Sequence, residues 1–410
     1  MIGILDLIFL FNIILIAILN CVIFHVPSKD RLLISKPSSL YKMLKYKSAQ
    51  STLRFKNSIN KEFAITLNKR VNEYFKCSGK GRNANSMMFI KTAFMFCLFF
   101  IPYSYVYSAT SVWMMLGCYF ITGFGVAGIG LSVMHDANHG SYSKNPLVNK
   151  IIGYSLNVIG GNATNWKIQH NVFHHSYTNI DTHDEDIRPR FILRFTPNAE
   201  LRSFHKYQYI YAWLLYGMMS FSWIVFKDFA QLVGYQKSGI LAKHVSVIKA
   251  WTWLVISKLL YYAYIMVIPF ILTPFSFLEI FLGFFVMHYA AGLILGSVFQ
   301  PAHVMEVNDY PIAEDDLIHD NWMAHQLKTT CNFAGNNRIF SWFIGGLNYQ
   351  IEHHLYPNIC HVHYAKLAPI VERTAKEFGI PYHNYGSFRK ALIKHKEMLF
   401  ALGRPKLKTF

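Results

Sequence analysis

The sequence predicts an all-α integral membrane protein, on the basis of its composition and of the clustering of its apolar residues. Of its 410 residues, 53% are hydrophobic and only 15% are charged, whereas a soluble protein carries about 25% charged residues. The apolar residues collect in stretches long enough to cross, as helices, a hydrocarbon core of about 30 Å. This pattern excludes a soluble enzyme, a disordered chain and a secreted disulfide scaffold. No C-x-x-C motif occurs, so we expect reduced cysteines.

Five apolar stretches have the length of a membrane-spanning helix. The first, residues 7–24, follows no basic residue and precedes no small-residue cleavage site, so we interpret it as a membrane anchor rather than a signal peptide. The other four form two hairpins and comprise residues 88–107, 111–134, 250–273 and 276–300. The sequence therefore predicts a four-helix transmembrane core with one extra N-terminal span.

Three further apolar segments do not fit a span. Residues 151–161 and 339–347 are too short and are typical of interfacial or re-entrant elements. Residues 205–230 are rich in aromatics with scattered charges, and we expect helices lying on the membrane. Within the third core span, Lys258 is unfavourable in lipid unless its ammonium group snorkels to the surface.

Three glycines in the second core span, Gly123, Gly125 and Gly128, match the pattern G-x-G-x-x-G. A dinucleotide-binding motif requires a preceding strand and a βαβ unit, and neither is expected here. Small residues in the middle of a span instead predict close packing between helices.

The net charge of +18 follows the membrane topology. Basic residues outnumber acidic ones by 14 to 3 in residues 26–87, by 12 to 7 in residues 135–249 and by 12 to 10 in residues 301–410. The short connections at 108–110 and 274–276 carry no charge. The positive-inside rule places the three basic segments in the cytoplasm and the N-terminus outside, and basic loops attract anionic lipids. We expect a bilayer as partner and no nucleic acid.

The histidines cluster close to the cytoplasmic ends of the spans. Two lie in HDANH, three in HNVFHH, one near the end of the last span and two in QIEHH. They are His135, His139, His170, His174, His175, His303, His353 and His354.

Their spacing suits metal binding. Residues i and i+4 share one face of a helix, so His135 with His139, and His170 with His174, can each direct two imidazoles at one point. Neutral imidazole is a common ligand for transition metals. Eight histidines exceed one tetrahedral site, so the sequence predicts two metal ions. Gln350 lies three and four residues before the last pair, which places its amide beside both imidazoles.

Acidic residues flank two of the clusters. Asp136 can accept a hydrogen bond from a metal-bound imidazole and orient it, a role that we weigh evenly against a structural one. For Asp181, Asp184, Glu185 and Asp186 a solvated loop is favoured over such a role.

The other histidines receive ordinary interpretations. His288 is expected to be a packed, hydrogen-bonded residue within a span. His361 and His363 are expected not to bind metal. Solvated loop positions are expected for His183, His205, His244, His319 and His325.

HDANH, HNVFHH and QIEHH, in this order and with this hydropathy, resemble the three histidine boxes of integral-membrane fatty acid desaturases. The resemblance runs from about residue 60 to 400 and includes NWKIQHNVFHHSYTNI and GGLNYQIEHHLYP. The glutamine that opens the third box is the mark of the front-end branch, which places double bonds between an existing one and the carboxyl end. His303, in FQPAHV, matches the additional histidine at the end of the last core span.

The resemblance implies four spans under a helical cytoplasmic cap that holds two iron ions, with O2 as co-substrate and a fatty acyl chain as substrate. From their hydropathy and charge, residues 1–87 are expected to form an anchor and a basic interfacial segment, including the amphipathic stretch 62–75. The desaturase domain then covers residues 88–400 and a basic tail covers 401–410. Gln350 replaces a histidine of other branches, and direct, water-mediated or absent metal contact all stay open. Trp166 and Tyr349 are candidate linings of an acyl tunnel, and aromatic residues of the membrane interface are the equally weighted alternative.

Two departures from the front-end pattern matter. The chain contains no HPGG haem motif of a fused cytochrome b5-like domain, so we expect a separate donor, either a ferredoxin or a cytochrome b5-like carrier with its reductase. The span 7–24 is extra to the core, with Met1 and Met43 as alternative starts. CoA and lipid stay alternatives as carriers of the acyl chain.

Two competing functions follow from the same residues. A hydroxylase or ketolase of the same superfamily shares the metal centre and adds oxygen instead of removing hydrogen. A membrane metal transporter places its ligands near the middle of the bilayer, whereas these histidines lie at the ends of the spans.

Overall fold

The computed structural model describes residues 53–405 except 182 and 188–190. The expected anchor at 7–24, the alternative start Met43 and residues 406–410 of the expected tail lie outside these residues. Within them the chain is mainly helical, and its only sheets are two parallel pairs of two-residue strands. In these pairs β1 (Arg54–Phe55) lies beside β2 (Leu317–Ile318), and β3 (Asn332–Phe333) lies beside β4 (Asn384–Tyr385).

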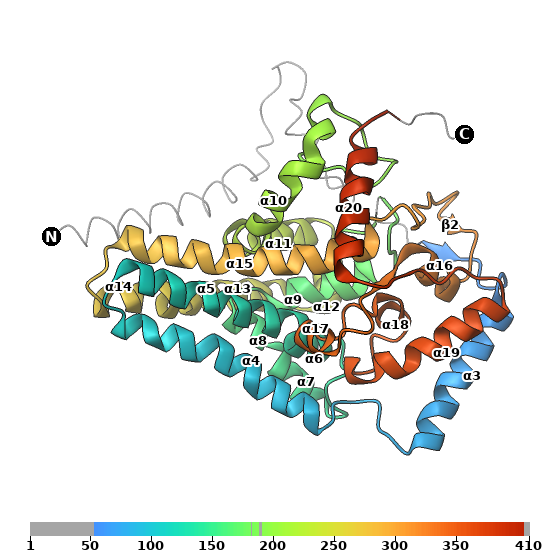
Figure 1. Cartoon of the computed structure of the whole chain (residues 1–410), viewed down its shortest axis with the longest axis horizontal. Helices are drawn as coiled ribbons and strands as arrows, with labels where there is room; N and C mark the ends of the chain where they lie inside the picture. The colour runs from blue at the N-terminus through green and yellow to red at the C-terminus, as the bar shows by residue number, and fades with distance from the viewer. Residues whose placement is uncertain (1–52, 182, 188–190, 406–410) are drawn as a thin grey trace.

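Four long helical rods form a bundle, and their axes are roughly aligned in Figure 1. The rods are Ser86–Ser108, Val112–Asn138, Val247–Leu272 and Phe277–His303. They begin with α4 (Ser86–Ser104), α5 (Val112–Gly128), α13 (Val247–Tyr262) and α15 (Phe277–His303) and continue through η1 (Tyr105–Ser108), η2 (Ile129–Val133), α6 (Met134–Asn138), η6 (Ala263–Val267) and α14 (Ile268–Leu272). All four are long and apolar enough to cross a membrane, which confirms the predicted core spans.

Local side chains start the bundle helices. The Asn85 side chain accepts a hydrogen bond from the Met88 N–H, and Ser111 accepts one from Met114. At α15 Ser276 and Glu279 form a reciprocal capping box. Each cap satisfies N–H groups that have no partner within the helix.

The glycine motif serves helix packing, as predicted. A Cβ atom on Gly123 would lie 2.5 Å from the Met287 carbonyl oxygen of α15. A Cβ on Gly125 would lie 2.5 Å from Phe99 Cα of α4. Because these positions admit no side chain, α5 approaches both neighbouring helices closely.

A further helical stretch, Ser203–Lys237, is also long and apolar enough to span a membrane. It comprises η4 (Ser203–Tyr207), α10 (Gln208–Ser222), η5 (Trp223–Lys227) and α11 (Asp228–Lys237). Figure 1 shows α10 inclined steeply to the bundle helices, and α10 packs against α15. Our interpretation of residues 205–230 as helices lying on the membrane stays a prediction.

The helix α3 (Lys61–Ser78) precedes the first hairpin. The other remaining elements lie between the two hairpins or after the last bundle helix. Between the hairpins these are α7 (Pro146–Gly153), α8 (Ser155–Val158), α9 (Ala163–Trp166), η3 (Lys167–His174) and α12 (Ile240–His244). After α15 these are α16 (Trp322–Thr329), α17 (Arg338–Phe343), α18 (Gln350–Leu355), η7 (His361–His363), α19 (Tyr364–Glu377) and α20 (Phe388–Leu402). We call α3, α16, α18 and α19 the cap.

The helix α3 (Lys61–Ser78) contains the amphipathic stretch that we assigned to the membrane interface. Its apolar residues Phe63, Leu67 and Val71 are buried in one cluster with residues of α16, α18 and α19. This apolar face is covered by protein rather than left for lipid. The boundary expected at residue 87 stays a prediction, although α3 packs with elements from the far end of the chain.

Two polar groups inside the bundle are satisfied internally. Lys258 does not snorkel, contrary to our expectation: its ammonium group is buried, lies 2.7 Å from the Asp228 carboxylate and donates to two backbone carbonyls. A buried cation needs such partners because burial removes its hydration. His288 is a packed, hydrogen-bonded residue, as predicted, and contacts Ser220 and Tyr261.

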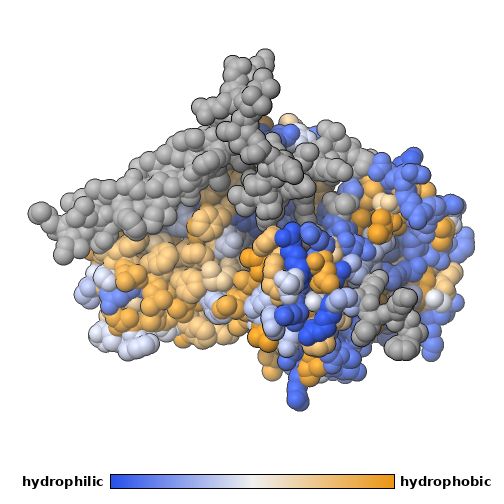
Figure 2. Space-filling view, turned by 90° about the horizontal axis from the view of Figure 1, so that it is seen from above, coloured by the Kyte–Doolittle hydropathy of each residue, from blue (hydrophilic) through white to orange (hydrophobic). Residues whose placement is uncertain are grey.

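The surface separates by hydropathy along the long axis of the molecule. In Figure 2 the visible surface over the outer part of the bundle is mostly hydrophobic, whereas the opposite end, with the cap, is mostly hydrophilic. Exposed apolar side chains on the bundle include Phe89, Trp113 and Leu278. A membrane covers such a surface, so the chain is a multi-pass membrane protein.

The cysteines in the described part of the chain are free thiols, as predicted. The structure describes five of the six, all without a disulfide: Cys77, Cys97, Cys118, Cys331 and Cys360.

Candidate metal centre

The eight histidines of the sequence clusters converge where the bundle meets the cap. The end of the second rod supplies His135 and His139, and η3 supplies His170 and His174 with His175 directly after it. The end of α15 supplies His303, and α18 supplies His353 and His354. Seven of the eight side chains are buried, and only His139 is partly exposed.

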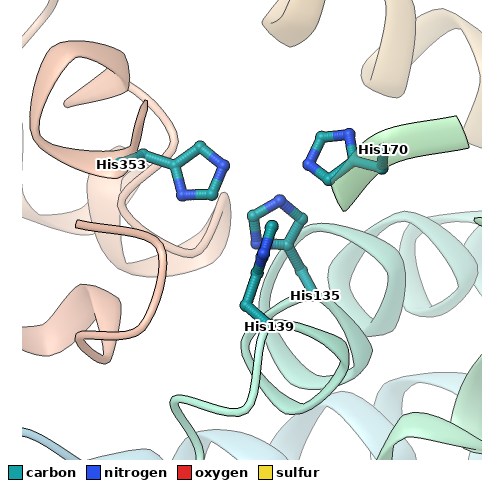
Figure 3. A group of neighbouring side chains, drawn as sticks. All are labelled: His135, His139, His170 and His353. Atoms are coloured by element: carbon teal, nitrogen blue, oxygen red, sulfur yellow. The ribbon is translucent and has the colours of Figure 1, made fainter. Parts of the chain in front are cut away.

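The first group combines all three clusters. One ligand atom each of His135, His139, His170 and His353 lies within 4.8 Å of the others. Figure 3 shows the four rings turned toward a common space from three separate segments. Four imidazoles in this arrangement fit one transition-metal ion.

The second group consists of His174, His303 and His354, again within 4.8 Å of one another. His175 lies between the groups. It forms a further set with His353 and His354, and its Nε2 atom is 3.2 Å from His170 Nε2. The eight side chains therefore provide two adjacent ligand sets rather than one.

The second cluster adopts a π-helix, which the sequence did not reveal. We expected His170 and His174 to share one face of an α-helix, but η3 is wound more widely, with the His175 N–H bonded to the His170 carbonyl. His170 belongs to the first group of histidines and His174 to the second, and both also form a set with Asp186. Such π segments are rare and concentrate at functional sites.

The ring nitrogens give a direct test of whether the cluster fits metal ions. Among the described residues, seven of the eight rings have a buried nitrogen without a hydrogen-bond partner, and the rings are His135, His139, His174, His175, His303, His353 and His354. Leaving buried polar atoms unpaired is unfavourable, and native proteins rarely do so. A pair of coordinated metal ions satisfies these atoms, so the residues fit the group.

Polar side chains contact the Nδ1 atoms of three of the imidazole rings. Asp184 accepts from His174 Nδ1 at 3.0 Å, and Gln326 Oε1 lies 2.9 Å from His354 Nδ1. Tyr364 OH lies 3.2 Å from His353 Nδ1. These contacts engage the Nδ1 atoms and leave the Nε2 atoms of the three rings facing inward, which is the usual way that proteins orient metal-bound histidines.

This arrangement corrects one expectation. Asp184 is not in a solvated loop but fully buried against His174. Asp186 lies 3.6 Å from both His170 Nδ1 and His174 Nδ1 and accepts a hydrogen bond from Gln169. Acidic residues close to the second cluster were a usable signal, whereas nothing in the sequence marked Gln326 or Tyr364.

The electrostatics keep most of the rings neutral. Burial lowers the pKa of His139, His175, His353 and His354 well below the usual value. Neutral imidazole is the form that binds metal. His174 differs, because the Asp184 and Asp186 carboxylates outweigh its burial and raise its pKa to about 9.

Gln350 lies in α18 with its side chain fully buried. Neither its amide nitrogen nor its amide oxygen has a hydrogen-bond partner among the described residues. A buried amide without partners is as unusual as an unpaired imidazole.

Asp136 has a different partner from the one that we weighed. Its carboxylate lies 3.9 Å from His135 Nδ1, beyond hydrogen-bonding distance, and 2.8 Å from His361 Nδ1. His361 Nε2 is in turn 2.6 Å from Lys91 Nζ. Asp136 thus ties the first cluster to the segment after the third one, and both ring nitrogens of His361 have partners.

Two of the histidines assigned to solvated loops are buried instead. His325 Nε2 lies 2.8 Å from the Thr178 carbonyl, and His205 Nδ1 accepts from the Arg202 N–H. His183 is partly buried, and His244 and His319 are exposed as expected. The partner of His325 lies 147 residues away and could not be predicted from local sequence, whereas His205 contacts a residue only three positions before it, at the start of η4.

The comparison with known families decides what this centre belongs to. The family model described as fatty acid desaturase matches residues 110–386, which include all eight histidines. The chain belongs to the fatty acid desaturase family.

Relatives of this desaturase are similar along most of its length. The sn-1 linoleoyl-lipid 6-desaturase of Arthrospira platensis is 37% identical, over 86% of this chain and 95% of the relative. The acyl-lipid (8-3)-desaturase of Physcomitrium patens is 34% identical, over 87% of this chain and 75% of the relative. The Delta(5) fatty acid desaturase A of Dictyostelium discoideum is 30% identical over 90% and 81%. None of these is a hydroxylase, a ketolase or a transporter, so the enzyme is an oxidoreductase of the desaturase type.

The desaturase has an apolar cavity of about 40 Å³ beside the first group. Trp166, one of the two candidate tunnel residues, lines it and stacks on His170 with ring centroids 4.4 Å apart. Phe299 also lines it and lies 6.4 Å from the His135 ring. Tyr349, the other expected tunnel residue, is not part of the lining and donates to the Gly335 carbonyl instead.

Proposed function

We propose that this desaturase is a front-end enzyme that inserts a cis double bond into a lipid-linked acyl chain, on the carboxyl side of an existing double bond. The names of the three relatives support the choice, because each specifies a position or a lipid substrate of this kind. The glutamine at position 350, which opens the third cluster, supports the same branch.

We further propose that the eight histidines hold two iron ions. The observation that carries this proposal is the convergence of two ligand sets whose inward nitrogens lack partners. His135, His139, His170 and His353 would hold one ion, and His174, His303 and His354 the other, with His175 between them. Gln350 would contact an ion directly or through water.

When bound, the iron pair supplies the oxidant, derived from O2, that can remove hydrogen from an unactivated methylene. The balanced reaction takes two hydrogens from adjacent carbons and, with two external electrons and two protons, converts O2 to two waters. The protein's own residues place the chain: Trp166 and Phe299 present an apolar wall that excludes water next to the first group. Asp184 and Gln326 hold His174 and His354 in position.

Two measurements test this function. The purified protein should carry about two iron ions per chain, and the product should be lighter than the substrate by two hydrogens. A single ion per chain contradicts the di-iron assignment. A product that gains an oxygen identifies a hydroxylase instead.

The orientation of the cap is a separate proposal, namely that it faces the cytoplasm. The excess of basic residues in 26–87 and 135–249 supports it. Reporter fusions after residues 109 and 240 should report opposite sides, with residue 240 inside. A fusion at 240 that reports the outside reverses the arrangement.

The electrons are proposed to come from a separate ferredoxin or cytochrome b5-like carrier. The absence of HPGG from these 410 residues supports this proposal. Purified enzyme should therefore need both a reductase and a carrier. Turnover with NADH alone contradicts the proposal.

A further inference from the structure

A second hollow is lined in part by residues 154–167, the segment that also lines the apolar cavity. It is an open cleft of about 650 Å³ between α6, α7 and α9, and its lining includes His139, the one partly exposed histidine of the eight. Three lysines, Lys144, Lys150 and Lys167, also line it, and no carboxylate does. A volume of this size suits a small ligand, since pockets for small molecules measure roughly 300–1,000 Å³.

The positive charge in the cleft is not neutralised by the protein. None of the three lysines forms an ion pair among the described residues. Lys167 is partly buried, and both this burial and the neighbouring charge of Lys150 lower its pKa. Two cations held near each other without a counter-ion favour an anionic ligand.

The rim of the cleft has the character of a membrane surface. The helix α7 exposes Leu147 and Ile151, at 60% and 59% of their full areas. Leu147 and Ile151 lie one turn apart on the helix, and Lys150 is the i+3 neighbour of Leu147, so it borders this apolar face. An apolar face bordered by lysine is typical of a helix in the lipid interface, where lysines attract anionic head groups.

Segment 154–167 connects the two hollows. Leu156, Gly161 and Trp166 line the apolar cavity, whereas Tyr154 and Lys167 line the cleft. His139 lines the cleft, and Trp166, which stacks on His170, lines the cavity, so both hollows border the first histidine group.

We infer that this cleft binds the anionic head group of a membrane glycerolipid whose acyl chain is the substrate. The inference rests on the proposed function and adds the head-group class to it. Because the cleft reaches His139, an anchored head group brings the carbons near the carboxyl end to the histidine cluster. A front-end enzyme requires anchoring at that end, because the position of its new double bond is defined by the distance from the carboxyl carbon.

Binding of short-chain lipids to the iron-loaded enzyme in detergent tests the inference without catalysis. Dihexanoyl phosphatidylglycerol should bind more tightly than zwitterionic dihexanoyl phosphatidylcholine. The double variant Lys150→Gln/Lys167→Gln should bind the anionic lipid about tenfold more weakly, because charge-assisted hydrogen bonds are lost. Its iron content and unfolding temperature should match those of the parent, which separates lost binding from lost folding.

A matched control removes two exposed lysines of α19, Lys366→Gln/Lys376→Gln, and should leave the affinity unchanged. Equal affinity of the parent for both lipids overturns the inference, as does equal weakening in the control.

Soluble CoA that displaces the anionic lipid at comparable concentration assigns the cleft to CoA instead. An acidic carrier protein that protects Lys150 and Lys167 from acetylation, while the lipid does not, assigns it to the electron donor. Iron content and product mass are unaffected by these outcomes, so the proposed function stands or falls separately.

Discussion

The two histidine groups lie side by side but differ in the side chains that surround them. We call these surroundings the apolar wall of the first group and the polar wall of the second. The first group faces aromatic rings: Trp166 lies 5.5 Å from His135, 5.4 Å from His139 and 4.4 Å from His170 between ring centroids. The second group is backed by polar atoms, with Asp184 against His174 and Gln326 against His354.

This difference separates two tasks within one centre. A ring held by packing on aromatic side chains borders the apolar cavity, and the wall that positions it can also contact an acyl chain. A ring held by hydrogen bonds has a fixed direction, because a carboxylate or an amide selects which nitrogen faces inward. We therefore assign the substrate side to the first group and the structural support to the second.

The largest effect is expected from removing a histidine of the second group. His174→Ala leaves His303 and His354 as an incomplete set and Asp184 buried without its partner, so desaturation should fall by more than about a hundredfold. Iron per chain, measured with the product yield, should drop from about two toward one. The exposed His319→Ala is the control and should behave as the parent. Full activity in His174→Ala removes the second group from the centre.

The next largest effect is expected at Gln350, whose amide group forms no hydrogen bond with either wall. Its buried amide has no partner among the described residues, so alanine should abolish or severely reduce desaturation with little loss of folded protein. Gln350→His should retain more activity than alanine, because an imidazole can still occupy the position. Product yield and thermal unfolding of both variants test this. Normal turnover in Gln350→Ala makes it a structural residue.

The sequence predicted the parts of the fold that local pattern controls. The four core spans, the close packing at Gly123 and Gly125, and the convergence of the eight histidines followed from hydropathy and spacing. The π-helix η3 did not, because its hydrogen bonds depend on packing rather than on a composition signal. The i,i+4 rule correctly placed His170 and His174 close together beside Asp186, but it could not show that each also joins a different group of histidines.

Contacts between distant segments account for the other differences. Lys258 meets Asp228 only because two helices cross, and His325 meets Thr178 only because α16 packs on the loop after η3. The helix α3 has the same amphipathic sequence pattern whether lipid or protein covers its apolar face. Composition therefore could not decide between an interfacial helix and one packed in the cap.

Asp184 offers a way to sharpen the comparison between the walls. Asp184→Asn removes the charge beside His174 and should weaken metal binding by about 10- to 100-fold, the usual effect of losing an outer partner. Asp136→Asn is the matched control, because Asp136 bonds to His361 and not to any of the eight rings. Iron retention against a chelator series should fall more in the first variant than in the second. Equal losses contradict the special role of the polar wall.

The smallest effect is expected at the apolar wall, at Gly130. This residue lines the cavity, and a Cβ there would meet Leu295 and Ile159 only at 3.6 and 3.9 Å, which is ordinary contact. Gly130→Ala should therefore fold and bind iron normally while its methyl group narrows the cavity. A methyl in an apolar pocket changes discrimination by about 1–3 kcal/mol, so kcat/KM should shift about tenfold toward shorter acyl chains. Gly117→Ala in the same rod, where a Cβ meets nothing within 4 Å, is the control. An unchanged chain-length profile in Gly130→Ala, with the control unchanged too, means that the acyl chain does not run along this wall.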